Sequence, residues 1–130
     1  MSPGLFTQDG TGRGAGAIRH NATGALVMDQ NPANAGEFVQ IFAGGLGAVS
    51  PPVGNGQAAP PQPLSSTALP VTVTVNGVTA PVSFAGLAPG FVGLYQVNAQ
   101  VPQVAAGAAQ VILTINGVAS PPVTMAVGSR

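Results

Sequence analysis

The residue best suited to acid–base chemistry is His20, the single histidine among 130 residues. A catalytic triad would use it as the general base, with Asp9, Asp29 or Glu37 orienting its ring. The sequence contains no nucleophile elbow of the G-x-S-x-G type to complete such a triad. We therefore predict that His20 is a surface histidine on a strand and that the protein is not an enzyme.

A second candidate is the glycine-rich stretch QDGTGRGAG, which carries Asp9. A phosphate-binding P-loop needs a lysine, and the chain has none. A dinucleotide fingerprint needs a helix after the glycines, and no helical periodicity follows. Calcium takes six to eight oxygen ligands, whereas Asp9, Asp29 and Glu37 are the only carboxylate side chains. We predict a glycine-rich turn in which Asp9 bonds its own backbone, with no metal and no cofactor.

The stretch FAGLAPGFVGLYQVN holds three of the six aromatic residues, Phe84, Phe91 and Tyr95. Exposed aromatic side chains could stack on a sugar ring. The alternative is structural: Phe84 and Phe91 would fill the core, and Tyr95 would form a tyrosine corner that ties the loop by its hydroxyl. The absence of tryptophan weakens the carbohydrate interpretation, so we predict the structural role.

The charge content is far below that of ordinary domains, at 5% against about a quarter. Three acids and three arginines leave no basic patch, which argues against nucleic acid and against docking on anionic membranes. No stretch approaches the length of a membrane span. An uncharged polar surface is typical of extracellular proteins, although the first ten residues lack the features of a signal peptide. The chain is thus either cytosolic or the mature part of a secreted protein, and we predict an extracellular location.

Two stretches forty positions apart carry nearly the same sequence, VTVTVNGVTAP at 71–81 and VILTINGVASP at 111–121. Each begins with aliphatic residues at period two, the pattern of a half-buried strand. Each then reaches Asn-Gly, the dipeptide of a type I′ hairpin turn with positive φ at both residues. We predict two equivalent hairpins with return strands at Val78–Phe84 and Val118–Val127, and Pro81 at an edge or bulge.

Other stretches also favour strands. Residues 37–43 read as one strand, and 17–29 as a hairpin that turns near residues 21–24. In residues 93–102, Tyr95, Val97, Ala99 and Val101 alternate with Gln96, Asn98 and Gln100, which predicts one buried face and one amide-rich exposed face. Glycine and proline make up about a quarter of the chain, which disfavours helices.

These signals predict an all-β protein, an antiparallel immunoglobulin-like β-sandwich of about seven or eight strands. Residues 1–16 would be a glycine-rich N-terminal segment, flexible unless it is pinned. Residues 17–130 would form a single domain, in which the proline- and glycine-rich stretch 44–70 is a long irregular connection.

Three motifs carry a family resemblance: SPGLFTQDGTGRGAGAI, NPANAGEFVQIFAGGLGAV and VSFAGLAPGFVGLYQVNAQVP. Through these motifs the chain resembles the uncharacterised C-terminal domain of secreted proteins of Solibacter-type acidobacteria, and the resemblance runs from residue 2 to about residue 127. The resemblance implies an immunoglobulin-like sandwich of the IPT/TIG kind at the end of large extracellular proteins. It implies no catalytic residue.

We therefore expect a non-enzymatic extracellular structural or interaction module. The chain could associate with itself, into fibres or surface assemblies, or with other extracellular modules. Its N-terminal segment would add as a strand to an open sheet edge of a neighbouring copy. A carbohydrate-binding module is the alternative. The residues expected to make these contacts are Leu5, Phe6, Ala17 and Ile18 for strand addition, and Tyr95, Gln96 and Asn98 for a glycan.

Overall fold

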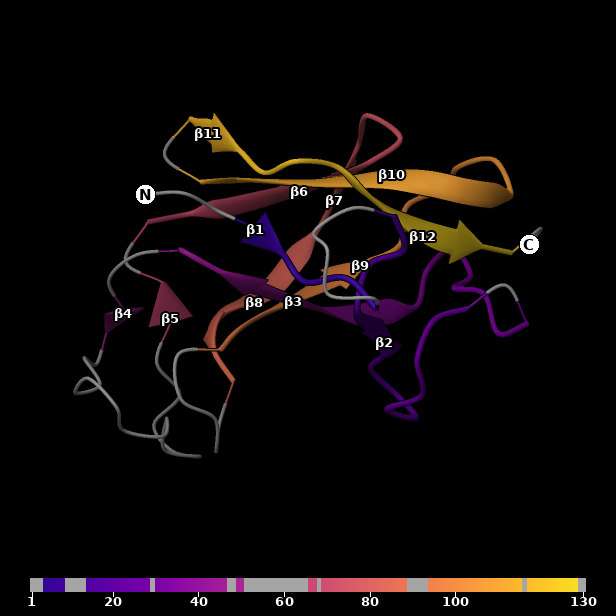
Figure 1. Ribbon diagram of the computed structural model, residues 1–130, viewed down its shortest axis with the longest axis horizontal. Coiled ribbons are helices and arrows are strands. Elements are labelled where there is room, and N and C mark those ends of the chain that lie inside the picture. Colours follow the sequence, from indigo (N-terminus) through magenta and orange to yellow (C-terminus); the bar gives the residue numbers. More distant parts are fainter. Residues whose placement is uncertain are drawn as a thin grey trace.

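The computed structural model describes residues 4–8, 14–28, 30–46, 49–50, 66–67, 69–88, 94–115 and 117–128. They form two antiparallel sheets packed face to face as a β-sandwich (Figure 1), which confirms the predicted all-β class. The seven-stranded sheet contains β1 (Gly4–Leu5), β2 (Ile18–His20), β3 (Phe38–Gly44), β4 (Val49–Ser50), β5 (Ser66–Thr67), β8 (Val82–Leu87) and β9 (Tyr95–Gln100). The five-stranded sheet contains β6 (Val71–Val75), β7 (Val78–Ala80), β10 (Gly107–Ile115), β11 (Val118–Ala119) and β12 (Val123–Val127).

The two repeated hairpins lie side by side in the five-stranded sheet, in the order β11-β10-β6-β7. Val73 faces Leu113 in the pairing of β6 with β10, and these two residues occupy equivalent positions in the repeats. Val71 and Val75 face Ile115 and Val111 in the same register. Antiparallel pairing of equivalent residues means that a local two-fold axis relates the hairpins. The repeated sequence therefore builds one symmetric four-stranded unit.

The turn of the first hairpin has the predicted conformation. Asn76 has a φ of 50° and Gly77 a φ of 81°, so both central residues are in the left-handed region that a type I′ turn requires. The Asn76 Oδ1 also accepts a hydrogen bond from the backbone N–H of Gln110, at 2.8 Å. In the second hairpin Gly117 has a φ of 76°, and Asn116 lies outside the described residues.

The return strand predicted at Val78–Phe84 is wrong, because the chain changes sheets at Pro81. β7 pairs with β6, whereas β8 pairs with β9 in the opposite sheet. Proline has no backbone N–H to donate to a ladder, and here its carbonyl oxygen accepts from the N–H of Gln100 at 2.8 Å. The predicted strand Val118–Val127 is likewise divided at its two prolines, into β11 and β12, although both halves pair with β10.

The N-terminal segment is pinned to both sheets of its own chain. β1 pairs with β3, so a strand lies within the segment predicted to be irregular. Ala15 pairs in parallel with Thr124 of β12, and the N–H of Gly16 donates to the Thr124 carbonyl at 2.8 Å. These contacts cover part of the free edge of β12, which would otherwise offer unpaired backbone groups to another chain.

The long connection at 44–70 also contains strands, in contrast to its predicted irregularity. β4 and β5 pair with each other, and Ser66 of β5 pairs with Gly86 of β8. In the hairpin predicted at 17–29, the chain turns at residues 21–23, directly after β2, as expected. The N–H of Val27 then donates back to the Ile18 carbonyl at 2.8 Å.

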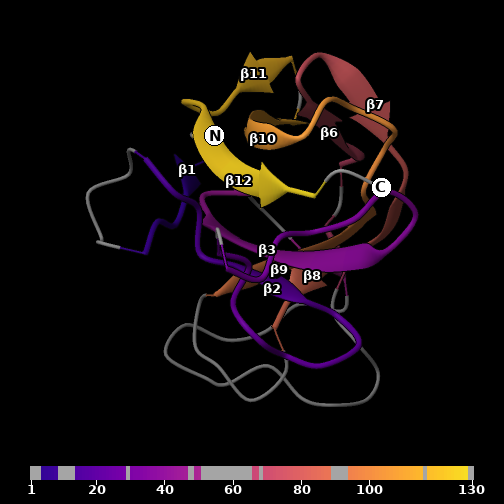
Figure 2. The ribbon, with the colours of Figure 1, turned by 90° about the vertical axis from the view of Figure 1, so that its right-hand side faces the viewer.

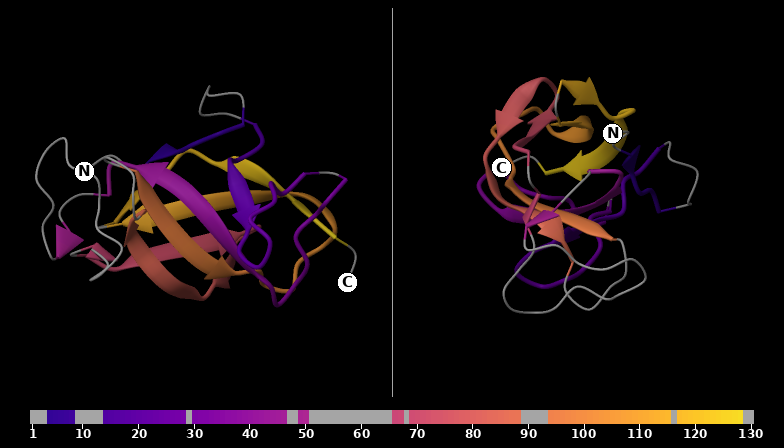
Figure 3. Two further views of the ribbon diagram at one scale, coloured as in Figure 1. Left: turned by 90° about the horizontal axis from the view of Figure 1, so that it is seen from below. Right: turned by 90° about the vertical axis from the view of Figure 1, so that its left-hand side faces the viewer.

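Figures 2 and 3 show the two sheets facing each other, and the buried apolar side chains of both form one core. Val73, Val111, Leu113 and Val97 have no exposed surface. On β9 the predicted alternation is confirmed, since Val97 and Ala99 are buried whereas Gln96, Asn98 and Gln100 are only partly covered. No helix among the described residues is long and apolar enough to cross a membrane.

Candidate functional site

The outer face of the seven-stranded sheet carries a shallow pocket. Phe42 of β3 faces Gln96 of β9, and Gln40 faces Asn98, so these four side chains occupy the outward positions at the centre of the sheet. The pocket above them measures about 330 Å³. Its lining residues come from β1, β2, β3, β9 and their flanks: Phe6, Ala17, Arg19, Leu26, Gln40, Phe42, Leu94 and Gln96. We call this the outer-face pocket.

Aromatic and aliphatic side chains form its apolar walls. Phe6 follows β1 and its N–H donates to the Phe42 carbonyl at 3.0 Å, which brings two aromatic residues to adjacent strands. The Phe6 ring lies over Gly44, where a Cβ would be 3.7 Å from the ring. Phe6 is nevertheless 46% exposed, an unusual value for a phenylalanine in a small domain. The ring is thus fixed on the sheet yet accessible from solvent.

Arg19 supplies the charge of the pocket. Its guanidinium carbon lies 5.6 Å from the centre of the Phe42 ring, within the range of a cation–π contact. Arg19 is the only lysine or arginine in the described part of the chain, and no carboxylate there pairs with it. A guanidinium held over a ring can still present its N–H fork to an anionic group.

Two amide pairs add polar groups to this face. The Gln40 Nε2 donates to the Asn21 Oδ1 at 2.9 Å, and the Gln96 Nε2 donates to the Asn98 Oδ1 at 2.8 Å. Each pair orients its side chains and leaves the glutamine at the pocket. Because an amide both donates and accepts, such groups suit a ligand with hydroxyls.

The predicted interaction residues are divided between the two faces of the sheet. Phe6, Ala17 and Gln96 line the pocket, and Asn98 is hydrogen-bonded to Gln96. Leu5 and Ile18 point inward as members of the core, 4% and 1% exposed. Tyr95 faces Ala43 and Leu87 on the inner side and packs against the core, in agreement with the inward face predicted for it in residues 93–102. Sequence reasoning missed Arg19 and Phe42, whose meeting depends on strand register.

His20 is buried, so its predicted surface position is wrong. The side chain points inward from β2 and is 7% exposed as a residue. Its Nε2–H donates to the Asn31 carbonyl oxygen at 2.9 Å, and Nδ1 lies 2.5 Å from Oε1 of Glu37. The other carboxylate oxygen of Glu37 accepts from the N–H of Asn34 at 2.7 Å. A triad needs Nε2 as a proton acceptor, whereas here it is a donor, so the network fastens the 31–37 segment to β2.

The same contacts set the protonation of His20. Burial of the ring by itself lowers the pKa of His20. The hydrogen bonds with Glu37 and Asn31 and the negative charge of Glu37 outweigh that effect, so the pKa is raised above 6.5. At a pH below this raised pKa, both ring nitrogens are protonated and both donate.

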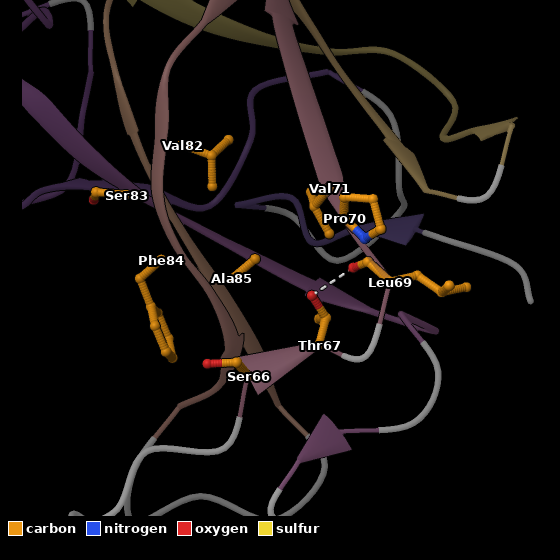
Figure 4. Close-up of a pocket in the computed structure, with 9 residues that line it drawn as sticks. All are labelled: Ser66, Thr67, Leu69, Pro70, Val71, Val82, Ser83, Phe84 and Ala85. Carbon is orange, nitrogen blue, oxygen red and sulfur yellow. Dashed lines mark hydrogen bonds between the residues drawn. The ribbon is translucent and has the colours of Figure 1, made fainter.

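A second hollow of about 350 Å³ lies where β5, the start of β6 and β8 meet (Figure 4). The hydroxyl of Thr67 there donates to the Leu69 carbonyl at 2.8 Å. Phe84, predicted to fill the core, is instead half-buried on the opposite side of β8 from Ala85. The hollow is lined by hydroxyl and apolar groups without a charged one among the described residues. Among the described residues, the edge of β8 that faces away from β9 pairs only through Gly86, which faces Ser66 of β5.

The hypotheses of a calcium site at Asp9 and Asp29 and of a core position for Phe91 concern residues outside the described ranges. Within those ranges, three or more histidine, aspartate or glutamate side chains do not gather into a group that could hold a metal ion.

Comparison with known proteins gave no match to a family model, to a curated protein or to a solved structure. The candidate site therefore rests on the geometry of this chain.

Proposed function

We propose that the protein is a non-enzymatic extracellular structural or interaction module that associates with copies of itself through its N-terminal segment. The observation that carries this proposal is the way β1 is attached. β1 contributes Leu5 to the core and pairs with β3 along only two residues. It is a short strand added to the edge of β3 by backbone hydrogen bonds.

Exchange of this strand between two copies would replace each contact by an identical one. Leu5 of one copy would face Ala43 of the other, and the Phe6 N–H would donate to the other copy's Phe42 carbonyl. Because no contact is lost, such a swap is a low-cost route to association. Addition of β1 to a different edge would instead leave the β3 edge and the Leu5 site empty. Exchange is therefore the form of strand addition that we favour.

A cysteine pair tests the exchange, because the chain has no native cysteine. The Phe6–Phe42 hydrogen bond makes the adjacent pair, Leu5 and Ala43, a non-hydrogen-bonded pair with Cα atoms about 4.5 Å apart. That separation suits a disulfide. The variant Leu5→Cys/Ala43→Cys would be incubated at increasing concentration, oxidised and run on non-reducing gels. The matched control, Thr74→Cys/Thr79→Cys, joins facing residues of one hairpin.

We expect covalent dimers and larger species from the Leu5–Ala43 pair, increasing with concentration, and monomers from the hairpin pair. Light scattering of the unmodified chain should show species above 12.6 kDa. Deleting residues 1–16 should abolish them. Intrachain crosslinks alone, with a monomer at every concentration, would refute self-association. Assembly that survives the deletion would refute the exchange and move the joint to another edge, such as that of β8.

Carbohydrate binding is a second candidate, favoured by the outer-face pocket. Exposed aromatic rings beside amide side chains are the combination that stacks on a sugar and bonds its hydroxyls. Titration of the protein with a set of soluble glycans, followed by NMR, would test it. Chemical-shift changes confined to the outer face would support it, and the absence of any change would dismiss it.

We also infer membership of the Solibacter-type family of C-terminal domains, with an immunoglobulin-like fold and an extracellular location. The support is the family motifs in the sequence together with a two-sheet all-β architecture. Detection of the natural protein in the secreted fraction, and its absence from the cytosol, would support that location. The reverse distribution would contradict it.

A further inference from the structure

We propose that the outer-face pocket binds an acidic saccharide, with Arg19 recognising the carboxylate of a uronic acid residue. This inference rests on the carbohydrate-binding candidate above and specifies its ligand class. Its basis is the juxtaposition of one guanidinium, two aromatic rings and two amide pairs around a single hollow.

The charge argument starts from Arg19. The described part of the chain places no carboxylate against it, so its only described contact is the Phe42 ring at 5.6 Å. A guanidinium bound to a carboxylate makes two parallel hydrogen bonds, which is the strongest single recognition that a side chain offers. Stacking on Phe42 keeps the guanidinium plane oriented for that contact. A single cation matches one carboxylate, whereas a phosphate group usually calls for several donors or charges.

The remaining lining describes the body of the ligand. Phe6 and Phe42 provide apolar faces. Gln40 provides an amide from β3, and Gln96 provides one from β9, where it faces Phe42. A pyranose ring has both kinds of surface, C–H groups on its faces and hydroxyls around its rim. The volume of about 330 Å³ is at the small end of ligand pockets, about 300–1,000 Å³, and suits one or two sugar rings.

The experiment compares two probes that differ in whether the carboxylate of each sugar residue is free or esterified. Oligogalacturonic acid and its methyl ester would each be titrated into the full chain, with affinity measured by calorimetry and position by NMR. We expect the acid to bind at least tenfold more tightly than the ester, since hydrogen bonds to charged groups are the stronger kind. Arg19→Gln should weaken binding of the acid by at least tenfold and remove the preference for the acid over the ester.

A matched pair of phenylalanine variants tests the stacking surface. Phe42 and Phe38 both point outward from β3, but Phe38 does not line the pocket. Phe42→Leu should weaken both probes severalfold, and Phe38→Leu should weaken neither. Unchanged circular dichroism would establish that both variants fold.

Each other result overturns part of the reasoning. Equal binding of acid and ester, insensitive to Arg19→Gln, would refute the acidic ligand and leave carbohydrate binding in place. Failure of both probes and of neutral glycans would refute carbohydrate binding as well. Binding of an acidic peptide with no saccharide bound would show that Arg19 recognises a different class of partner.

Discussion

Replacing Glu37 by glutamine should reverse the pH dependence of stability. In the native protein His20 has a raised pKa, because Glu37 and Asn31 stabilise its protonated form more than burial disfavours it. A raised folded-state pKa gives stability that is fully present below the unfolded value of about 6.5. That stability is lost as the pH increases through the folded-state pKa. The native protein should therefore be more stable at about pH 5.5 than at about pH 8.

In Glu37→Gln the amide would donate to Nδ1 of neutral His20, so the network persists at high pH. Protonation of Nδ1 breaks that bond and leaves a buried cation without its carboxylate. Burial, the largest influence on this ring, then lowers the pKa of His20, and stability falls as the pH drops below about 6.5. The two proteins should diverge toward acid, in opposite directions.

The magnitude follows from what Glu37 holds. It accepts from Nδ1 of His20 at 2.5 Å and from the Asn34 N–H at 2.7 Å. Hydrogen bonds to a charged group contribute about 1.5–3 kcal/mol each. The glutamine oxygen keeps the second bond, and the Glu37 side chain is 28% exposed, so we expect about 2 kcal/mol at pH about 5.5. For a chain of this length that is a Tm difference of about 8 °C.

Thermal unfolding, followed by circular dichroism from pH about 5.5 to about 8, measures this. His20 is the only histidine, so no other imidazole contributes. The control His20→Asn should remove the difference between the two ends of the range. Parallel curves for the native protein and Glu37→Gln would show that the His20–Glu37 pair does not set the pH dependence.

Two further predictions concern glycines. Gly16→Ala should destabilise the protein by about 1–3 kcal/mol, because its Cβ would lie 2.9 Å from Cδ1 of buried Ile18. The control Gly4→Ala places its Cβ within 4 Å of no other atom and should be neutral. Urea denaturation measures both variants. Gly77→Ala and Gly117→Ala should each cost about 1–2 kcal/mol, since both positions have positive φ, and their equal cost would reflect the two-fold relation of the hairpins. Clearly unequal losses of unfolding free energy in the same assay would mean that the two turns contribute differently to stability despite their related backbones.

The fold class was predictable because period-two alternation is a local signal. Val71–Val75 and Gly107–Ile115 each bury every second residue, and the Asn-Gly turn at residues 76–77 has the φ values that its sequence requires. These features need no knowledge of distant residues. The strands β1, β4 and β5 have two residues each, too few to display a period.

The change of sheet at Pro81 was not predictable from the pattern. Aliphatic residues continue on both sides of the proline, so a single return strand looks equally regular. The change of sheet depends on the pairing partner of each segment: β7 pairs with β6 before the proline, and β8 pairs with β9 after it. The same limit applies to the pocket. Arg19 and Phe42 are 23 positions apart, and only the register of β2 on β3 brings them together.

The repeat symmetry and the proposed binding site lie in different sheets. The repeated hairpins point Val73 and Leu113 into the core, and their outward neighbours Thr72, Thr74 and Thr114 carry no charge. The outward position equivalent to Thr72 is Ile112, so the outer surface of this unit is uncharged in both repeats, which suits a scaffold. The seven-stranded sheet has no such repeat, and its outer face collects the described arginine, the aromatic rings and the amides.

Phe6 joins the two proposals into one structural argument. It directly follows Leu5, so the strand that would be exchanged also brings one wall of the outer-face pocket. A swapped dimer would keep every pocket complete, because each β3 would receive a Phe6 from the other copy. A released N-terminal segment would instead remove that wall. A saccharide that contacts Phe6 must therefore favour docked β1 over free β1, whichever copy supplies the strand. The size of this effect equals the difference between the saccharide's affinities for the two states. Ligand binding would therefore stabilise docked β1 in the monomer and in the exchanged dimer alike, through the side chain that directly follows this strand.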